Sequence, residues 1–265
     1  APRTPRSFGT GSYNYKYMKL FYLGLSCLSN NAAGNARRAG NSGFGQALHA
    51  EGRRILGLLD TERSGLAGEP SGQAPEPAAI AVENGGRPFF VDHHADFNIS
   101  HSRHMAAVAW SEAINPASGL LLRVGCDIQH IFPGKSREAI ARKYYSPGEN
   151  NYIGAAPDTP EQERIDRFYR IWVLKECYLK AKGLSVLDMR TSPSFAARDG
   201  LVKEVPVPFG FFLYELDDGS ADRYVLAVCR ETGLPAAAPL PEIRWFSAAL
   251  ALKQIAAIEG VNATG

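Results

Sequence analysis

Two acidic residues lie in apolar segments that are far apart along the chain. Asp127 lies in the run LLLRVGCDIQHI, and Glu176 lies in the segment FYRIWVLKECYLKAKG. A carboxylate among apolar side chains is costly unless it is paired, protonated or bound to a metal ion. Mg²⁺ is commonly held by one or two carboxylates, while substrate phosphates and water complete its octahedron. Together, Asp127 and Glu176 could form an oxygen site for Mg²⁺ that acts on a phosphate-bearing substrate.

Each acid also has a purely structural interpretation. Glu176 could form a local pair with Lys180, four residues further along a helix. Asp127 could cap the turn that follows its strand. Side chains alternate faces along a strand, so Gln129 is expected on the same side as Asp127.

Hydroxyl and imidazole groups form a third candidate element. Ser100, His101 and Ser102 follow one another just before the apolar run MAAVAW. Such a run can present hydrogen-bond donors to an anion, although a single histidine is often a structural or surface residue.

The elements that must position these residues are mixed in type. Apolar spacing predicts helices over residues 46–60, 137–145 and 161–182, with Gly183 closing the last one. Strands are predicted over residues 80–82, 89–91, 107–110, 120–131 and 243–246, and a hairpin over residues 211–216 and 224–230. Residues 65–77 and 147–160 are predicted as loops. Regular βαβ repeats and a Gly-rich nucleotide loop are missing from this sequence, so an α+β fold is expected.

The order of the motifs resembles one enzyme family, the Sfp-type 4′-phosphopantetheinyl transferases of the holo-acyl-carrier-protein synthase superfamily. Their signature is G-x-D followed by W-x-x-K-E-x-x-x-K. Here it appears as Gly125-Cys126-Asp127 and as Trp172, Lys175, Glu176 and Lys180. Gly86-Arg87-Pro88 and Ser100-His101-Ser102 also match the family's upstream motifs. The resemblance is densest between residues 87 and 183.

The resemblance implies a function and a set of site residues. Such enzymes transfer the 4′-phosphopantetheine group from coenzyme A to a serine of an apo acyl or peptidyl carrier protein and release adenosine 3′,5′-bisphosphate. Asp127, Glu176 and Gln129 would hold Mg²⁺, or Mn²⁺ in its place. Many relatives carry an acid where this chain has Gln129. Asp127, Glu176 and Lys180 would be the catalytic residues, with Glu176 receiving the serine proton. Residues implied to bind coenzyme A are Arg53, Arg87, Ser100, His101, Lys175 and Lys180.

The same resemblance implies two similar α+β halves that form a pseudo-dimer, with the active site in the cleft between them. The expected division is a leader or expression remnant over residues 1–17, an N-terminal half over residues 18–124 and a C-terminal half over residues 125–265. Relatives serve fatty-acid, polyketide and nonribosomal-peptide carriers and usually act as monomers.

Composition limits the kinds of partner and the cellular compartment that are expected. The net charge is only +2, so a nucleic-acid partner is not expected. The four cysteines form no CxxC or Cys/His spacing, which favours a reducing, cytoplasmic location. Residues 18–32 resemble a short secretory signal, but we favour a strand, because the apolar run is too short to span a membrane.

Two other functions remain open. The segment Asp92-His93-His94-Ala95-Asp96 is similar to the motif of DHH phosphoesterases, although the further aspartate motifs of those hydrolases are missing from the preceding sequence. Alternatively, the protein could be a non-catalytic module that binds coenzyme A or a carrier protein.

Overall fold

The computed structural model describes ten stretches of the chain. They are residues 21–27, 40–63, 79–83, 85–115, 118–134, 136–154, 157–217, 222–232, 240–245 and 251–260. The leader predicted for residues 1–17 and the loop predicted for residues 65–77 lie outside these stretches. No helix among the described residues combines the length and the apolar character that a membrane crossing requires.

The first sheet has four strands in the order β12–β1–β5–β4. Their bounds are Glu242–Trp245 for β12, Phe21–Cys27 for β1, Met105–Ser111 for β5 and Asp96–Ser102 for β4. Strand β1 pairs antiparallel with β5 and parallel with β12, so a strand from late in the chain joins strands from its early part. Helix α2 (Gly40–Arg63) packs on β4 and β5.

The second sheet has five strands in the order β6–β11–β10–β13–β9. Their bounds are Val124–His130 for β6, Arg223–Glu231 for β11, Phe209–Asp217 for β10, Ala251–Gly260 for β13 and Glu204–Val205 for β9. Helix α5 (Glu161–Lys182) packs on β6 and β11, and α3 (Arg137–Tyr144) and α4 (Pro147–Ile153) pack on α5. The remaining elements are β2 (Ile80–Val82), β3 (Pro88–Phe90), η2 (Val186–Thr191), β7 (Ala196–Ala197) and β8 (Gly200–Leu201).

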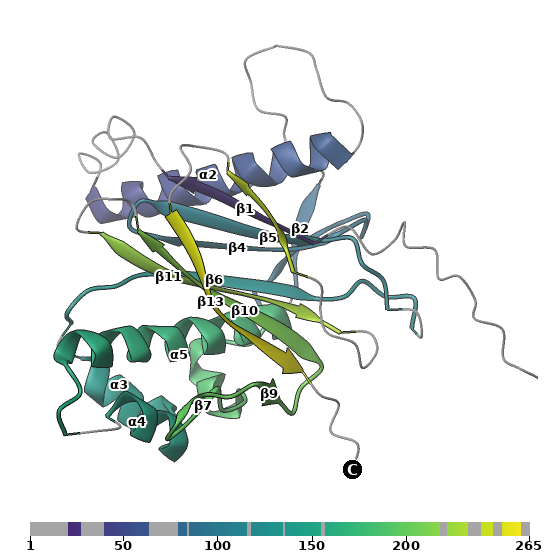
Figure 1. Ribbon diagram of the computed structural model, residues 1–265. Coiled ribbons are helices and arrows are strands. Elements are labelled where there is room, and N and C mark those ends of the chain that lie inside the picture. Colours follow the sequence, from purple (N-terminus) through teal and green to yellow (C-terminus); the bar gives the residue numbers. More distant parts are fainter. Residues whose placement is uncertain are drawn as a thin grey trace, which may run out of the picture.

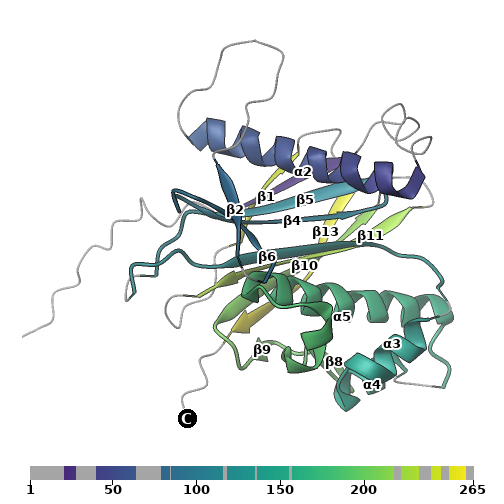
Figure 2. The same cartoon turned by 180° about the vertical axis from the view of Figure 1, so that it is seen from behind.

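These elements form four layers, with α2 on one side, the two sheets in the middle and α5 on the other side (Figures 1 and 2). Each boundary between layers has its own apolar cluster. Ile55 of α2 packs with Trp110 of β5, Leu25 of β1 packs in the cluster that includes Ile128 of β6, and Leu179 of α5 packs in the cluster that includes Ala227 of β11. Burial of these side chains holds the two sheets face to face.

The edge strands β4 and β6 are joined by side chains. Alternate residues of β4 are small and polar, and each accepts a hydrogen bond from an alternate backbone N–H of β6. The pairs are Asp96 with Val124 (2.7 Å), Asn98 with Cys126 (3.0 Å), Ser100 with Ile128 (3.2 Å) and Ser102 with His130 (2.9 Å). This side-chain ladder satisfies buried donors that would otherwise be costly, and it fixes the register between the two sheets.

Several predictions from the sequence are confirmed. The fold is a mixture of helices and strands, as an α+β class requires. Helix α5 has the predicted bounds, and Gly183 ends it in the left-handed conformation with φ of 68°. The hairpin of β10 and β11 is present. Residues 21–27 form a strand, which agrees with the preferred interpretation of that segment.

Other predictions are wrong. Residues 147–160 are not all loop, because Pro147–Ile153 form α4, which begins with a capping box between Ser146 and Glu149. Strand β6 begins at Val124 rather than at residue 120, and Leu120 is 69% exposed. Strand β13 was not predicted, because charged and apolar residues are mixed along it and do not alternate cleanly.

Candidate functional site

A cavity of about 380 Å³ lies where α2, β4, β6 and α5 meet. Six of the nine site residues predicted from the sequence line it: Ser100, His101, Asp127, Gln129, Glu176 and Lys180. Trp172, Glu176 and Lys180 follow one another at intervals of four residues, so one face of α5 supplies all three to the cavity. The cavity therefore gathers the predicted residues from strands and helices that are distant in sequence.

Asp127 is buried on β6 and accepts hydrogen bonds from three side chains. Its residue exposure is 1%. Oδ1 accepts from Lys180 Nζ at 2.6 Å and from Ser100 Oγ at 2.9 Å, and Oδ2 accepts from Gln129 Nε2 at 3.1 Å. The ammonium of Lys180 compensates for the loss of water around this buried carboxylate. Asp127 thus binds polar side chains inside the cavity and does not cap a turn.

Glu176 faces the cavity from α5 and is half-buried. Burial raises the pKa of its carboxyl group above the ordinary value, and the negative charge of Asp127 raises it further, while Lys180 acts in the opposite direction. The two acids are therefore close enough to repel each other, and Lys180 pairs with Asp127 rather than with Glu176. This excess of negative charge is the environment in which a divalent cation is stabilised.

The donor set agrees with a magnesium site completed by its substrate. Among the residues that the structure describes, no group of three or more His, Cys, Asp or Glu side chains could hold a metal ion. A site made of the two carboxylates of Asp127 and Glu176 and the amide of Gln129 fits the chemistry of Mg²⁺, which relies on substrate phosphates and water for its remaining ligands.

Basic side chains also line the same cavity. Although burial opposes the charged form of Lys180, the neighbouring Asp127 raises the pKa of its ammonium above the ordinary value. His101 on β4 also lines the cavity; burial lowers the pKa of its imidazole, and the positive charges of Lys180 and His49 lower it further. Sequence reasoning missed His49, which reaches the cavity from α2, because a single histidine in a helix carries no motif.

Three of the predicted coenzyme A residues do not line this cavity. Arg87 is buried, with an exposure of 4%. Its guanidinium donates to both carboxylate oxygens of Asp96 (2.8 and 2.6 Å), to the Val124 carbonyl (2.9 Å) and to the Lys180 carbonyl (3.1 Å). Arg87 therefore joins β4, β6 and the end of α5, and it borders an adjoining hollow of about 190 Å³ that Lys180 also lines.

Lys175 and Arg53 also lie away from the cavity. Lys175 is 2% exposed and forms an ion pair with Glu149 of α4 at 3.1 Å. Burial lowers the pKa of its ammonium, and Glu149 opposes that change. One residue of α-helix turns the chain by about 100°, so the step from Glu176 to Lys175 leads to a different face of α5. Arg53 is exposed on α2.

The DHH-like segment has structural contacts of its own. His94 Nε2 lies 3.1 Å from Asp60 Oδ1, and the His94 ring packs on Phe90 and Trp110. Asp96 is paired with Arg87. None of these groups belongs to a metal-ligating cluster within the described stretches. The segment is thus a turn that packs on the first sheet.

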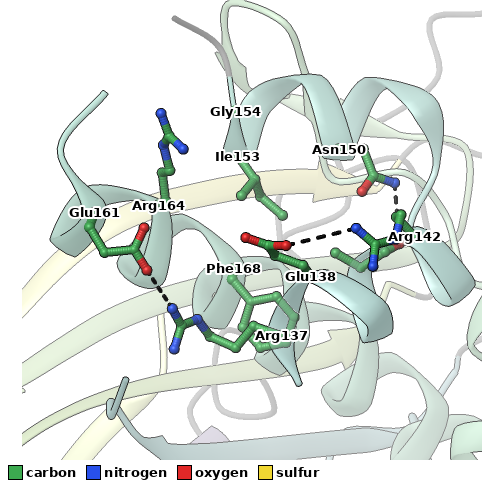
Figure 3. Close-up of a pocket in the computed structure, with 10 residues that line it drawn as sticks. Arg137, Glu138, Arg142, Asn150, Ile153, Gly154, Glu161, Arg164 and Phe168 are labelled. Atoms are coloured by element: carbon green, nitrogen blue, oxygen red, sulfur yellow. Dashed lines mark hydrogen bonds and ion pairs between the residues drawn. The ribbon is translucent and has the colours of Figure 1, made fainter. Parts of the chain in front are cut away.

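Another cavity lies between α3, α4 and the first turns of α5 (Figure 3). Its charged side chains are largely paired with one another, since Arg137 lies 2.7 Å from Glu161 and Arg142 lies 3.8 Å from Glu138. It contains none of the nine predicted site residues. The cavity around Asp127 and Glu176 is therefore the candidate site.

Comparison with known proteins identifies relatives of this chain. Residues 123–229 match the family model described as the 4′-phosphopantetheinyl transferase superfamily. The chain is similar to the 4′-phosphopantetheinyl transferase HetI of Nostoc sp., with 30% identity over 151 residues, 54% of this chain and 57% of HetI. It is also similar to a 4′-phosphopantetheinyl transferase of Bacillus subtilis, with 34% identity over 169 residues, 58% of this chain and 64% of that enzyme.

A third relative is the putative 4′-phosphopantetheinyl transferase of Haemophilus influenzae, which is 29% identical over 138 residues. That match covers 52% of this chain and 53% of the relative. The chain thus spans less than two thirds of the length of these curated relatives. The segment matched by the family model contains Asp127 and Glu176.

Proposed function

We propose that this chain transfers the 4′-phosphopantetheine group from coenzyme A to a serine of an apo carrier protein, because residues 123–229 match the 4′-phosphopantetheinyl transferase superfamily model. One observation carries the proposal. Asp127 of β6 and Glu176 of α5 line a single cavity and interact through their charges, with the ammonium of Lys180 beside them. The names of the three relatives add support, since each is called a 4′-phosphopantetheinyl transferase.

Asp127, Glu176 and Gln129 would hold Mg²⁺ in this cavity. When bound, the ion would neutralise negative charge on the coenzyme A diphosphate. The amide of Gln129 now donates to Asp127 Oδ2, and rotation of that amide would present its oxygen instead. A neutral amide oxygen adds no charge, so Asp127 and Glu176 would supply the charge of the protein ligands.

The transfer can then be written with its atoms balanced. The carrier serine Oγ attacks the β-phosphorus of coenzyme A, a new P–O bond forms, and the bond to adenosine 3′,5′-bisphosphate breaks. The hydroxyl proton passes to the carboxylate of Glu176, directly or through one water molecule. A carboxyl group whose pKa lies above the ordinary value is a better proton acceptor than an exposed one.

Cationic residues would neutralise and orient the phosphates. Lys180 would neutralise charge that develops on the leaving bisphosphate, and His101 and His49 would donate hydrogen bonds to phosphate oxygens. Such a reaction depends mainly on positioning and charge neutralisation. This agrees with a cavity built of carboxylates, an ammonium and imidazoles.

The residues outside the cavity have supporting roles in this proposal. Arg87 and Lys175 would fix the strands and helices that carry Asp127 and Glu176, because both are buried and paired. This differs from direct contact with coenzyme A, which the resemblance implied for them. The division into two similar halves, the monomeric state and the cytoplasmic location stay predictions.

Mass spectrometry of intact carriers tests the proposed function. The protein is incubated with coenzyme A, Mg²⁺ and a panel of apo carriers from fatty-acid, polyketide and nonribosomal-peptide systems. At least one carrier should gain the mass of one phosphopantetheine group, and its serine-to-alanine variant should not. Absence of any gain across the panel, with coenzyme A still bound, would favour a non-catalytic binding module.

A further inference from the structure

The ammonium of Lys180 is bound to the carboxylate of Asp127, which the proposed function assigns as a ligand of the divalent cation. Lys180 Nζ lies 2.6 Å from Asp127 Oδ1 and 3.0 Å from Ser100 Oγ. The Asp127 side chain is 2% exposed, whereas the Lys180 side chain is 28% exposed. The carboxylate is therefore fixed in the protein interior, while the ammonium reaches it from the side of the cavity.

Asp127 needs a positive partner at every stage. A buried carboxylate that loses its counter-ion is strongly destabilised. Among the described residues, its other oxygen receives only the neutral amide of Gln129, which carries no compensating charge. Lys180 can leave Oδ1 only if another cation takes its place, and a cation can bind Oδ1 only if Lys180 finds another negative group.

The cavity offers such a negative group only when an anionic ligand is bound. Glu176 lines the same space and also stabilises the charge of Lys180, but the proposed function assigns its carboxylate to the cation as well. His101 and His49 also line the cavity, and their imidazoles can donate hydrogen bonds to an anion. An entering diphosphate would thus be attracted to Lys180 and to both imidazoles.

We propose that Lys180 is an internal counter-ion of Asp127 that is exchanged for the divalent cation when a nucleotide diphosphate binds, so that the cation and the diphosphate bind cooperatively. This inference rests on the proposed function for the identity of the two ligands. Without nucleotide, Lys180 competes with the cation for Asp127. With nucleotide, the ammonium moves to the phosphates and the competition disappears.

The exchange implies that the affinities for the cation and for the nucleotide are linked. If the nucleotide increases the affinity for the cation by some factor, the cation must increase the affinity for the nucleotide by the same factor. Coupling between two sites is typically about 5-fold to 150-fold. Part of this coupling should be lost when the lysine charge is removed, because the competition is then missing from the nucleotide-free state.

Manganese binding measures the exchange without relying on turnover. The full chain is titrated with Mn²⁺, and free Mn²⁺ is followed by electron paramagnetic resonance, with and without coenzyme A. The test variant is Lys180→Met. Lys182→Met is the matched control, since Lys182 is an exposed lysine of the same helix that does not line the cavity. Lys180→Gln is a second test variant that keeps hydrogen-bond donors for Asp127 and Ser100.

In the absence of coenzyme A, Lys180→Met should bind Mn²⁺ about tenfold more tightly than the native protein, and coenzyme A should increase that affinity much less. Lys180→Gln should change in the same direction, and Lys182→Met should behave as the native protein does. Mn²⁺ should also raise the melting temperature of Lys180→Met more than that of the native protein, because it replaces the missing counter-ion.

Unchanged or weaker Mn²⁺ binding by both Lys180 variants in the absence of coenzyme A would overturn the exchange. If the native protein still modified carriers, the proposed function would stand in that case. Equal Mn²⁺ affinity of the native protein with and without coenzyme A would likewise overturn the exchange. A native protein that bound no Mn²⁺ under either condition and modified no carrier would refute the proposed function as well.

Discussion

Gly125 of β6 lies directly against the carbonyl oxygen of Cys177 of α5. A Cβ atom added to Gly125 would lie 2.1 Å from that oxygen, which is far inside contact distance. Cys177 Sγ also donates to the Gly125 carbonyl at 3.3 Å. Only glycine allows the strand and the helix to approach so closely, and this approach brings Asp127 beside Glu176 and Lys180. The glycine of the G-x-D motif therefore sets the spacing of the site.

Gly125→Ala tests this spacing. The added methyl group should force α5 away from β6, lower the free energy of unfolding by about 1–3 kcal/mol and reduce carrier modification. Denaturant unfolding and the carrier mass assay would measure both effects. Gly154→Ala is the control, because its Cβ would meet nothing closer than the Asn150 carbonyl at 3.8 Å. Equal stability and activity of the two variants would show that β6 and α5 tolerate a wider separation.

Glu176→Gln should remove activity and leave the fold intact. The amide keeps the shape of the side chain but cannot accept the serine proton and brings no charge to the cation. We expect the rate of transfer to fall by about 100-fold or more. Glu163→Gln, on an exposed part of the same helix, should retain the native rate. A Glu176→Gln protein with near-native turnover would remove Glu176 from the mechanism.

The raised pKa of Glu176 predicts how stability depends on pH. Burial and the charge of Asp127 favour the protonated carboxyl group in the folded protein. Its contribution to stability is therefore complete below the ordinary pKa and is lost as the pH rises through the raised value. The stability of Glu176→Gln relative to the native protein should increase across that interval and then level off. Thermal unfolding of both proteins in metal-free buffers measures the difference; a difference that decreases with rising pH would contradict the assignment.

Asn98→Ala tests the side-chain ladder between the two sheets. Asn98 Oδ1 accepts a buried hydrogen bond from the backbone N–H of Cys126 at 3.0 Å. Its removal leaves that N–H without its partner, so the free energy of unfolding should fall by about 1–3 kcal/mol. Chemical denaturation provides the measurement, with the exposed Asn151→Ala as the control. If both substitutions cost the same, the ladder would contribute little to joining β4 and β6.

Periodicity and motif spacing predicted α5, its end at Gly183 and the hairpin of β10 and β11. These elements follow from local preferences, which a single sequence records. Asp127 and Glu176 could be selected as candidate site residues from the sequence, because a carboxylate in an apolar segment needs a partner in any fold. Their meeting in one cavity also required the motif resemblance, since periodicity contains no information about how β6 packs on α5.

Other features depend on tertiary contacts that the sequence does not display. Ser100 was expected to face an anion, yet its hydroxyl also holds β6 and contacts both Asp127 and Lys180. Arg87 and Lys175 were expected to bind coenzyme A, but each has a buried carboxylate partner from another element. Lys175 precedes Glu176 by one residue, and a helical rotation of about 100° places it on a different face of α5.

Locating the bound ion tests the central claim most directly. Crystals grown with coenzyme A and Mn²⁺ would give an anomalous difference map in which the manganese position is unambiguous. We expect one peak within about 2.0–2.3 Å of a carboxylate oxygen of Asp127 and of Glu176, next to the diphosphate. A peak bound to the diphosphate but out of reach of either carboxylate would contradict this account of the site.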